Sequence, residues 1–206
     1  MTNHSICFYI INNKFFFTLL FSLFLFFGCR TPKSALQMGH STVNEKLPLS
    51  YNELRKLDVT FTDGLIQKMY GNYPQATDKF NKCLDIYPYH TSSMYEIAYI
   101  CNETGKSSDA IPFIQKAVLI DDNNTWYKLL LAHCLMETFR FDEAANVFQK
   151  LIKYEPDKIE YYFNRASALL HAGKIKDALE MYDKIEEKIG ITEELCIQKQ
   201  KIFLSQ

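Results

Sequence analysis

The sequence predicts an all-α fold, a solenoid built from helix–turn–helix repeats, and three observations lead to it. Residue types fall into columns when the chain is compared with itself at a spacing of 34 residues. Two of these columns contain only small residues, which fit where two antiparallel helices come closest. Two further columns are rich in Gly and in Pro, which end helices and force turns. One helical pair has too little apolar surface to fold alone, and stacking supplies the core.

Ahead of the repeats, the N-terminus has the anatomy of an export signal. Residues 15–27 contain no charged residue, follow Lys14 and precede Gly28. As a helix they would span about 20 Å, which is short of the roughly 30 Å hydrocarbon core of a bilayer. A basic residue, a short apolar core and a small final residue are typical of a secretory signal. We therefore predict that residues 1–28 are a signal peptide.

The end of this signal resembles the bacterial lipobox, at which the signal is cut before a Cys that carries a diacylglycerol. The matching residues are Phe26-Phe27-Gly28-Cys29, with Phe26 where Leu is usual. The resemblance implies lipidation of Cys29, and two or three acyl chains would hold the protein stably on a bilayer. Two alternatives stay open: an uncleaved signal anchor, which the apolar stretch 6–11 favours, and a cleaved signal without lipid.

A tether and a well-marked helix start come next. Residues 29–49 are polar and aperiodic, which predicts a flexible tether. Ser50 and Glu53 have the spacing of a capping box, in which each side chain bonds to the backbone amide of the other residue. The helix that this box opens is expected to run through about Met69.

Four units of the period follow within residues 50–192. The fifteenth column carries Gly as a left-handed helix terminator, except in the third unit, where Phe139 replaces it. Pro88 and Pro156 stand where the second helix of a unit must end. The units are 57–90, 91–124, 125–158 and 159–192, with small residues in column eight (Gly64, Ala98, Ala132, Ala166) and in column twenty (Ala76, Ala110, Ala144, Ala178).

This pattern resembles the tetratricopeptide repeat across about residues 57–192. The resemblance implies a right-handed superhelix whose concave face is lined mainly by the first helix of each unit. The first unit departs from the pattern, because Thr60 and Asp63 stand where large apolar residues are usual, so we expect it to act partly as a cap. Residues 193–206 are expected to form either a capping helix or the first helix of a fifth repeat that is cut off at Gln206.

The resemblance also implies which residues face the concave groove. Groove positions that carry Lys and Asn in the chaperone-tail receptors of this family are aromatic or aliphatic here, and Glu103 and Glu137 would repel a terminal carboxylate. An aromatic groove suits apolar or aromatic anchors of a protein partner. The alternative interpretation is that some of these residues, especially Tyr95, Trp126 and Phe163, pack between helices of the short array and do not line a groove. The predicted partner groove consists of Phe61, Leu65, Tyr95, Tyr99, Trp126, Leu129, His133 and Phe163.

Chemistry-bearing motifs are absent from the sequence. It contains no Gly-rich phosphate loop, zinc-protease motif or nucleophile elbow, so we predict no enzyme, no catalytic residue and no cofactor. His133 and Cys134 are neighbours, but neighbours on a helix point about 100° apart. Residues 121–124 are read as a turn with an N-cap rather than a metal site. Four cysteines are predicted to be buried, unpaired thiols: Cys83, Cys101, Cys134 and Cys196.

The overall charge narrows the function further. The formal net charge is −1, and a nucleic-acid binder would normally show a basic face or a high pI. We expect a non-enzymatic scaffold that binds a protein of the cell envelope, in an assembly or secretion machine. Arg30 follows the lipidated Cys, where Asp would retain many lipoproteins in the inner membrane, so the outer membrane facing the periplasm is favoured. The alternative is an envelope lipoprotein that binds a glycan or a lipid in the groove.

Overall fold

The computed structural model describes residues 49–204, without the side chain of Phe203, and this part of the chain is all-helical. The predicted signal peptide, the lipidation site Cys29 and the tether as far as residue 48 lie outside the described residues. No helix between residues 49 and 204 is long and apolar enough to cross a membrane. The nine helices of this part are α2 (Tyr51–Met69), α3 (Tyr73–Ile86), α4 (Thr91–Glu103), α5 (Ser107–Ile120), α6 (Thr125–Glu137), α7 (Phe141–Tyr154), α8 (Ile159–His171), α9 (Ile175–Ile189) and α10 (Glu193–Leu204).

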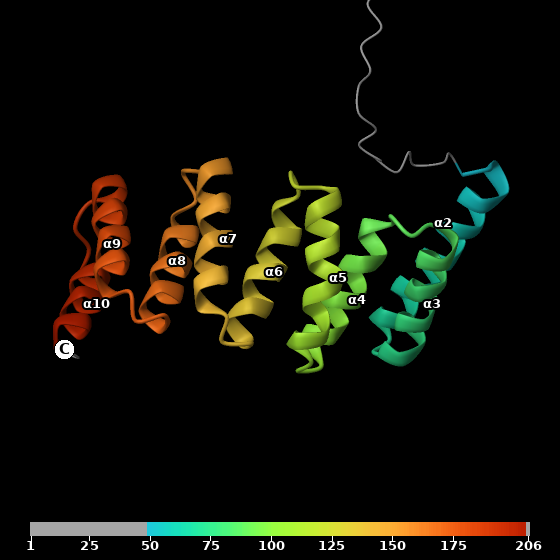
Figure 1. Cartoon of the computed structure of the whole chain (residues 1–206), viewed down its shortest axis with the longest axis horizontal. Coiled ribbons are helices and arrows are strands. Elements are labelled where there is room, and N and C mark those ends of the chain that lie inside the picture. Colours follow the sequence, from blue (N-terminus) through green and yellow to red (C-terminus); the bar gives the residue numbers. More distant parts are fainter. Residues whose placement is uncertain (1–48, 205–206) are drawn as a thin grey trace, which may run out of the picture. The chain divides into compact units, whose positions relative to one another are not determined.

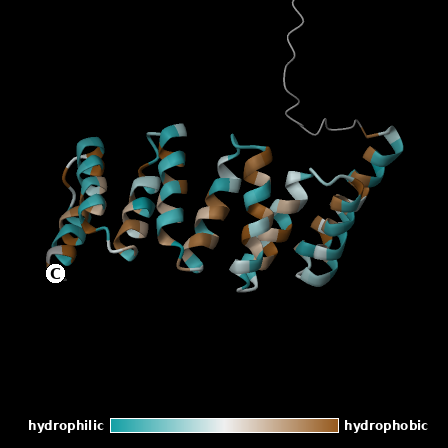
Figure 2. Cartoon of the chain, in the orientation of Figure 1, coloured by the Kyte–Doolittle hydropathy of each residue, from teal (hydrophilic) through white to brown (hydrophobic). Residues whose placement is uncertain are grey.

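Consecutive helices pack against one another as hairpins, and the hairpins stand in a row in chain order (Figure 1). The pairs are α2/α3, α4/α5, α6/α7 and α8/α9, and α10 packs on α9. The helices carry both apolar and polar residues (Figure 2). Buried apolar residues form two adjoining core clusters, and residues of α3, α4 and α5 pack against both. The predicted all-α array of helical hairpins is confirmed.

The capping box at the start of α2 is present as predicted. The Ser50 Oγ accepts a hydrogen bond from the Glu53 amide at 3.3 Å, and the Ser50 amide donates to Glu53 Oε2 at 2.9 Å. The Ser50 hydroxyl also donates to Glu53 Oε2 at 2.7 Å, and this bond, together with the one from the Ser50 amide, holds the pKa of Glu53 below its ordinary value because both favour the charged carboxylate. The helix runs to Met69, as the sequence indicated.

The small-residue columns lie inside the hairpins. Every Ala of columns eight and twenty is fully buried. Gly64 has no room for a side chain, since a Cβ built on it would lie 2.6 Å from the Cε1 atom of Phe80 on α3. The first hairpin therefore needs Gly at a place where the other three accept Ala.

The fifteenth column adopts the left-handed backbone that was predicted for it, with φ of 75° at Gly71, 72° at Gly105 and 74° at Gly173. Phe139 keeps the same turn in the third unit, with φ of 60°, although it has a Cβ. A left-handed conformation costs an L-residue about 1–2 kcal/mol. The Phe139 ring is 79% exposed and lies 5.9 Å from the Phe141 ring, so little burial offsets that cost.

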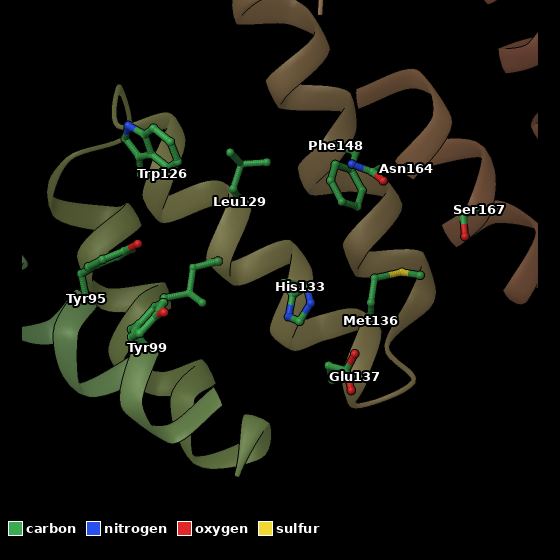
Figure 3. Close-up of a pocket in the computed structure, with 11 residues that line it drawn as sticks. Tyr95, Tyr99, Trp126, Leu129, His133, Met136, Glu137, Phe148, Asn164 and Ser167 are labelled. Atoms are coloured by element: carbon green, nitrogen blue, oxygen red, sulfur yellow. The ribbon is translucent and has the colours of Figure 1, made fainter. Parts of the chain in front are cut away.

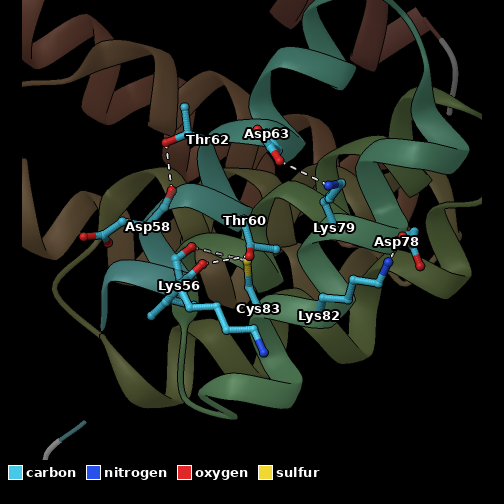
Figure 4. A network of polar contacts seen from close by, with 10 residues as sticks. Lys56, Asp58, Thr60, Thr62, Asp63, Asp78, Lys79, Lys82 and Cys83 are labelled. Carbon is cyan, nitrogen blue, oxygen red and sulfur yellow. Dashed lines mark hydrogen bonds and ion pairs between the residues drawn. The ribbon is translucent and has the colours of Figure 1, made fainter. Parts of the chain in front are cut away.

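The first hairpin contains a group of polar contacts, including an ion pair between its two helices (Figure 4). Asp63 on α2 pairs with Lys79 on α3 at 3.1 Å, whereas the corresponding positions of the next unit are Ile97 and Phe113. Val59 is 55% exposed, whereas the residues at its position in the later units, Ser93, Tyr127 and Tyr161, are buried. The Tyr127 hydroxyl donates to Thr91 of the preceding hairpin at 3.2 Å. The side of α2 that bears Val59 is therefore not covered by another hairpin of residues 49–204.

Helix α10 packs on α9 as the first helix of each later repeat packs on the repeat before it. Leu195 and Ile202 are buried, and Lys199 pairs with Asp183 of α9 at 2.8 Å. Gln200 is exposed on this helix, at the position where the four repeats carry Gly or Ala.

The prediction for the cysteines was wrong for two of the four. Cys83 and Cys134 are buried, but Cys101 is half-buried and Cys196 is exposed, and all four are free thiols. Cys196 lies on a side of α10 that no helix of residues 49–204 covers, so burial fails there for want of a neighbour.

Candidate functional site

A groove with a volume of about 490 Å³ lies between α4, α6, α7 and α8. Its lining includes five of the eight residues predicted for a partner groove (Figure 3). Helix α4 contributes two of them and α6 contributes three, because the periodicity of each helix turns these positions toward the same side. The five residues are Tyr95, Tyr99, Trp126, Leu129 and His133.

The other three predicted residues do not line this groove. The Phe61 ring lies 5.5 Å from the Phe80 ring and 5.0 Å from His90, and Leu65 packs against the same cluster in the first hairpin. Phe163 packs against the main core, with its ring 6.2 Å from that of Tyr182. The structure therefore gathers the central residues of the aromatic ladder and places those of the outer repeats in hairpin packing.

Some lining residues were not predicted. Phe148 of α7 is a core residue that forms part of the groove wall, and Leu130 and Asn164 come from the sixth position of their units. The sequence contained a signal for Leu130, which stands four residues after Trp126 and three before His133 and therefore shares their face of the helix, and Asn164 has the same place in the fourth unit. Phe148 is an apolar residue of the second helix of its unit, and only the packed structure shows that one side of this core residue reaches the groove.

Aromatic rings dominate the α4 side of the groove. Tyr95 and Tyr99 stack with ring centroids 6.3 Å apart, and Tyr95 also lies 5.5 Å from Tyr127. Burial, aided by the charge of Glu96, raises the pKa of Tyr95, so its hydroxyl stays neutral. Trp126, the single tryptophan of the chain, faces Tyr95 from α6. It is 69% exposed, which is unusual for so large an apolar side chain.

A second hollow, of about 400 Å³, adjoins the first and has a polar lining. Both hollows are bordered by His133 and Glu137. Asn102 organises the wall between them: its Oδ1 accepts hydrogen bonds from Ser107 Oγ at 3.0 Å and from Cys134 Sγ at 3.4 Å. Its Nδ2 is then left to donate to His133 Nδ1 at 3.3 Å, which assigns the proton of a neutral His133 to Nε2.

The Cys134 thiol has a structural place in this wall. Burial raises its pKa to about 11, so it is protonated at neutral pH and donates to Asn102. A thiol that is buried and protonated is a poor nucleophile. No group of three His, Cys, Asp or Glu side chains in the described part of the chain is placed to hold a metal ion.

A buried lysine fixes the turn in front of α6, and the sequence did not indicate it. Lys128 is 1% exposed, lies 3.9 Å above the centre of the Tyr154 ring and pairs with Asp122 Oδ1 at 3.3 Å. Its Nζ also donates to the backbone carbonyl of Asp122, and Tyr154 donates its hydroxyl to Asp122 Oδ2 at 2.8 Å. The hydrogen bonds from Tyr154 and Lys128 hold the pKa of Asp122 below its ordinary value.

The same turn carries the predicted N-cap of α6. Asn124 Oδ1 accepts hydrogen bonds from the amides of Trp126 and Tyr127 at 3.1 and 3.3 Å. The Lys128 contacts and this cap together hold the first turn of α6, and with it the backbone that carries Trp126.

A row of helical hairpins with an open, aromatic groove defines the class of α-solenoid scaffolds. Two models described as tetratricopeptide repeat match residues 91–124 and 129–190. The chain belongs to the tetratricopeptide repeat family, whose repeats are typically non-enzymatic scaffolds for protein–protein interaction.

Relatives among characterised proteins match over short stretches. The chain is 30% identical over 74 residues to the tetratricopeptide repeat protein 30 homolog of Drosophila melanogaster, a match that covers 36% of this chain and 11% of that protein. It is 26% identical over 126 residues to DnaJ homolog subfamily C member 3 of Mus musculus, covering 59% of this chain and 25% of that protein. The chain therefore spans a quarter or less of the length of these relatives.

Solved structures show the same fold. YrrB, described as a tetratricopeptide repeat protein with an unusual peptide-binding site, superposes with a TM-score of 0.60 at 21% identity, covering 70% of this chain and 74% of that one. MamA from Desulfovibrio magneticus RS-1 superposes with a TM-score of 0.57 at 19% identity, covering 64% of this chain and 74% of that one.

Proposed function

We propose that this protein is a membrane-tethered scaffold that holds one segment of a cell-envelope protein in the groove between α4 and α6. The exposure of Trp126 carries the proposal, because a tryptophan on the rim of a preformed hollow is the kind of residue that dominates binding energy. Tyr99 and Leu129 extend the apolar surface beside it. The resemblance in fold to YrrB, which is described as binding a peptide, supports a groove of this use.

The proposal predicts that Trp126→Ala combined with Tyr99→Ala releases the partner. Truncation of a central aromatic anchor costs about 2–4 kcal/mol of binding free energy, so the loss should exceed tenfold in Kd. Tyr95 is left intact because its ring packs on Tyr127. The measurement is capture of the partner from crosslinked envelopes, followed by titration of the identified partner.

The matched control is Lys150→Ala with Lys153→Ala on α7, where both side chains are exposed outside the groove. This pair should retain the partner. Release by the lysine pair together with retention by the aromatic pair would locate the binding face elsewhere. Capture of a glycan or a lipid in place of a protein would favour the alternative ligand class.

The tether in this proposal is a lipid on Cys29, supported by the Phe26-Phe27-Gly28-Cys29 sequence. Arg30 after it favours the outer membrane, with the repeats in the periplasm. Cys29→Ser should abolish metabolic labelling with a radioactive fatty acid and leave an unprocessed precursor on a gel. The four cysteines of residues 49–204 serve as the internal control, because substituting any of them should leave the labelling unchanged. Equal labelling of Cys29→Ser and the unaltered protein would refute the lipid anchor.

A further inference from the structure

We infer that the segment held in this groove is cationic, with a Lys or Arg side chain next to an aliphatic or aromatic anchor. The inference rests on the proposed function and adds the chemistry of the partner. It is drawn from the way an apolar hollow and an acidic one meet at His133 and Glu137.

The anchor would occupy the larger hollow. Trp126, Tyr99 and Leu129 present rings and an aliphatic chain there, and a partner side chain buried among them would lose its contact with water. In Figure 3 the rings of Tyr95 and Tyr99 lie on the α4 side and the Trp126 indole on the α6 side of this space. Such rings also attract cations, as the protein itself shows: the Lys68 Nζ lies 4.8 Å from the centre of the Tyr99 ring.

The cation would lie against the smaller hollow. Glu103 and Glu137 border it, both are exposed, and neither forms an ion pair with another residue in the range 49–204. The lining of the two hollows includes no Lys or Arg. Lys68, which approaches the groove at Tyr99, is already paired with Glu96 at 2.6 Å, so it does not offset the two free carboxylates.

The charge balance of the groove therefore selects its occupant. Two unpaired carboxylates beside an uncharged aromatic hollow repel an acidic segment or a terminal carboxylate and attract a Lys or Arg side chain. A cation seated between the carboxylates and the rings would gain from both. Because the carboxylates are exposed, the attraction should weaken as salt rises.

A peptide array on the full-length protein tests the inference. The probes are short capped peptides that share one set of Phe, Leu and Trp anchors, flanked in parallel series by Lys or Arg, by Gln, or by Glu. Peptides of the Lys and Arg series should bind most tightly, and the preference should shrink at high salt. Glu103→Gln with Glu137→Gln should weaken the Lys series by about threefold to tenfold, the range for two exposed ion pairs, and leave the Gln series unchanged.

Asp85→Asn with Glu187→Gln is the matched control, since it removes two exposed carboxylates from α3 and α9 and should leave all series unchanged. Equal binding of the three series, preference for the Glu series, or no binding in any series would overturn the inference. The variant Trp126→Ala with Tyr99→Ala separates this from the proposed function. If this variant releases the captured envelope partner while flanking charge has no effect on the peptides, the groove binds its partner without a cation and only the inference fails.

Discussion

Ala144→Leu is expected to lower the free energy of unfolding by about 1–3 kcal/mol, because a larger side chain in a well-packed core forces neighbours off their preferred rotamers. Ala144 is fully buried in α7 and stands in the column that holds Ala in all four hairpins. Each repeat of a solenoid depends on its neighbours, so the loss should spread to the adjoining hairpins. Urea denaturation followed by circular dichroism measures the change.

The control is Asn146→Leu, which adds a leucine to an exposed position of the same helix. It should change the unfolding midpoint little, since surface substitutions of this kind usually stay within about 0.5 kcal/mol. An equal effect of both substitutions, or no effect of Ala144→Leu, would contradict the packing of α6 against α7.

The fold could be predicted from the sequence because its main constraints are local and repeat. Column eight is small because two helix backbones approach there, and Ala98, Ala132 and Ala166 are all fully buried. The capping box at Ser50 needs only residues three apart. Phe139 shows how strong the pattern is, since the turn keeps its left-handed backbone even where Gly is missing.

The groove could be predicted only in part, because the same column has different surroundings in different repeats. Tyr95 and Phe61 both occupy the fifth position of a unit. Tyr95 faces the groove formed by α4 and α6, whereas Phe61 turns to Phe80 and His90 in a hairpin that no described hairpin precedes. The neighbouring repeats decide which residues of a column line the groove, and the residue types in the column do not reveal how those repeats pack.

The contacts of Lys128 could not be predicted from the sequence, for a different reason. A lysine in a helix ordinarily extends into solvent, and its burial here depends on two partners from other segments, Asp122 in the preceding turn and Tyr154 at the end of α7. Their meeting is a product of the hairpin geometry. The residues that position Trp126 thus come from the tertiary structure, while Trp126 itself was found by its place in the repeat.

The largest loss of stability is expected for Phe80→Ala in the first hairpin. Phe80 is fully buried, and truncation of a buried Phe costs about 3–5 kcal/mol through lost transfer free energy and the cavity left behind. The Phe61 ring, 5.5 Å away, would lose this aromatic neighbour and keep its contact with the His90 ring at 5.0 Å. Chemical denaturation should show a lower midpoint, and the loss should be greatest in the first two repeats. A variant as stable as the unaltered protein would contradict the packing of α2 on α3.

Gly64 makes this prediction more specific, since its effect should change sign with the residue at position 80. Alone, Gly64→Ala should destabilise the protein, because its Cβ would lie 2.6 Å from the Phe80 ring. In the Phe80→Ala background the ring is gone, and the same substitution should stabilise α2 by up to about 1 kcal/mol, the helix preference of Ala over Gly. The four proteins form a double-mutant cycle whose coupling energy isolates the contact. A destabilising Gly64→Ala in both backgrounds would mean that backbone atoms, rather than the Phe80 ring, exclude a side chain at this position.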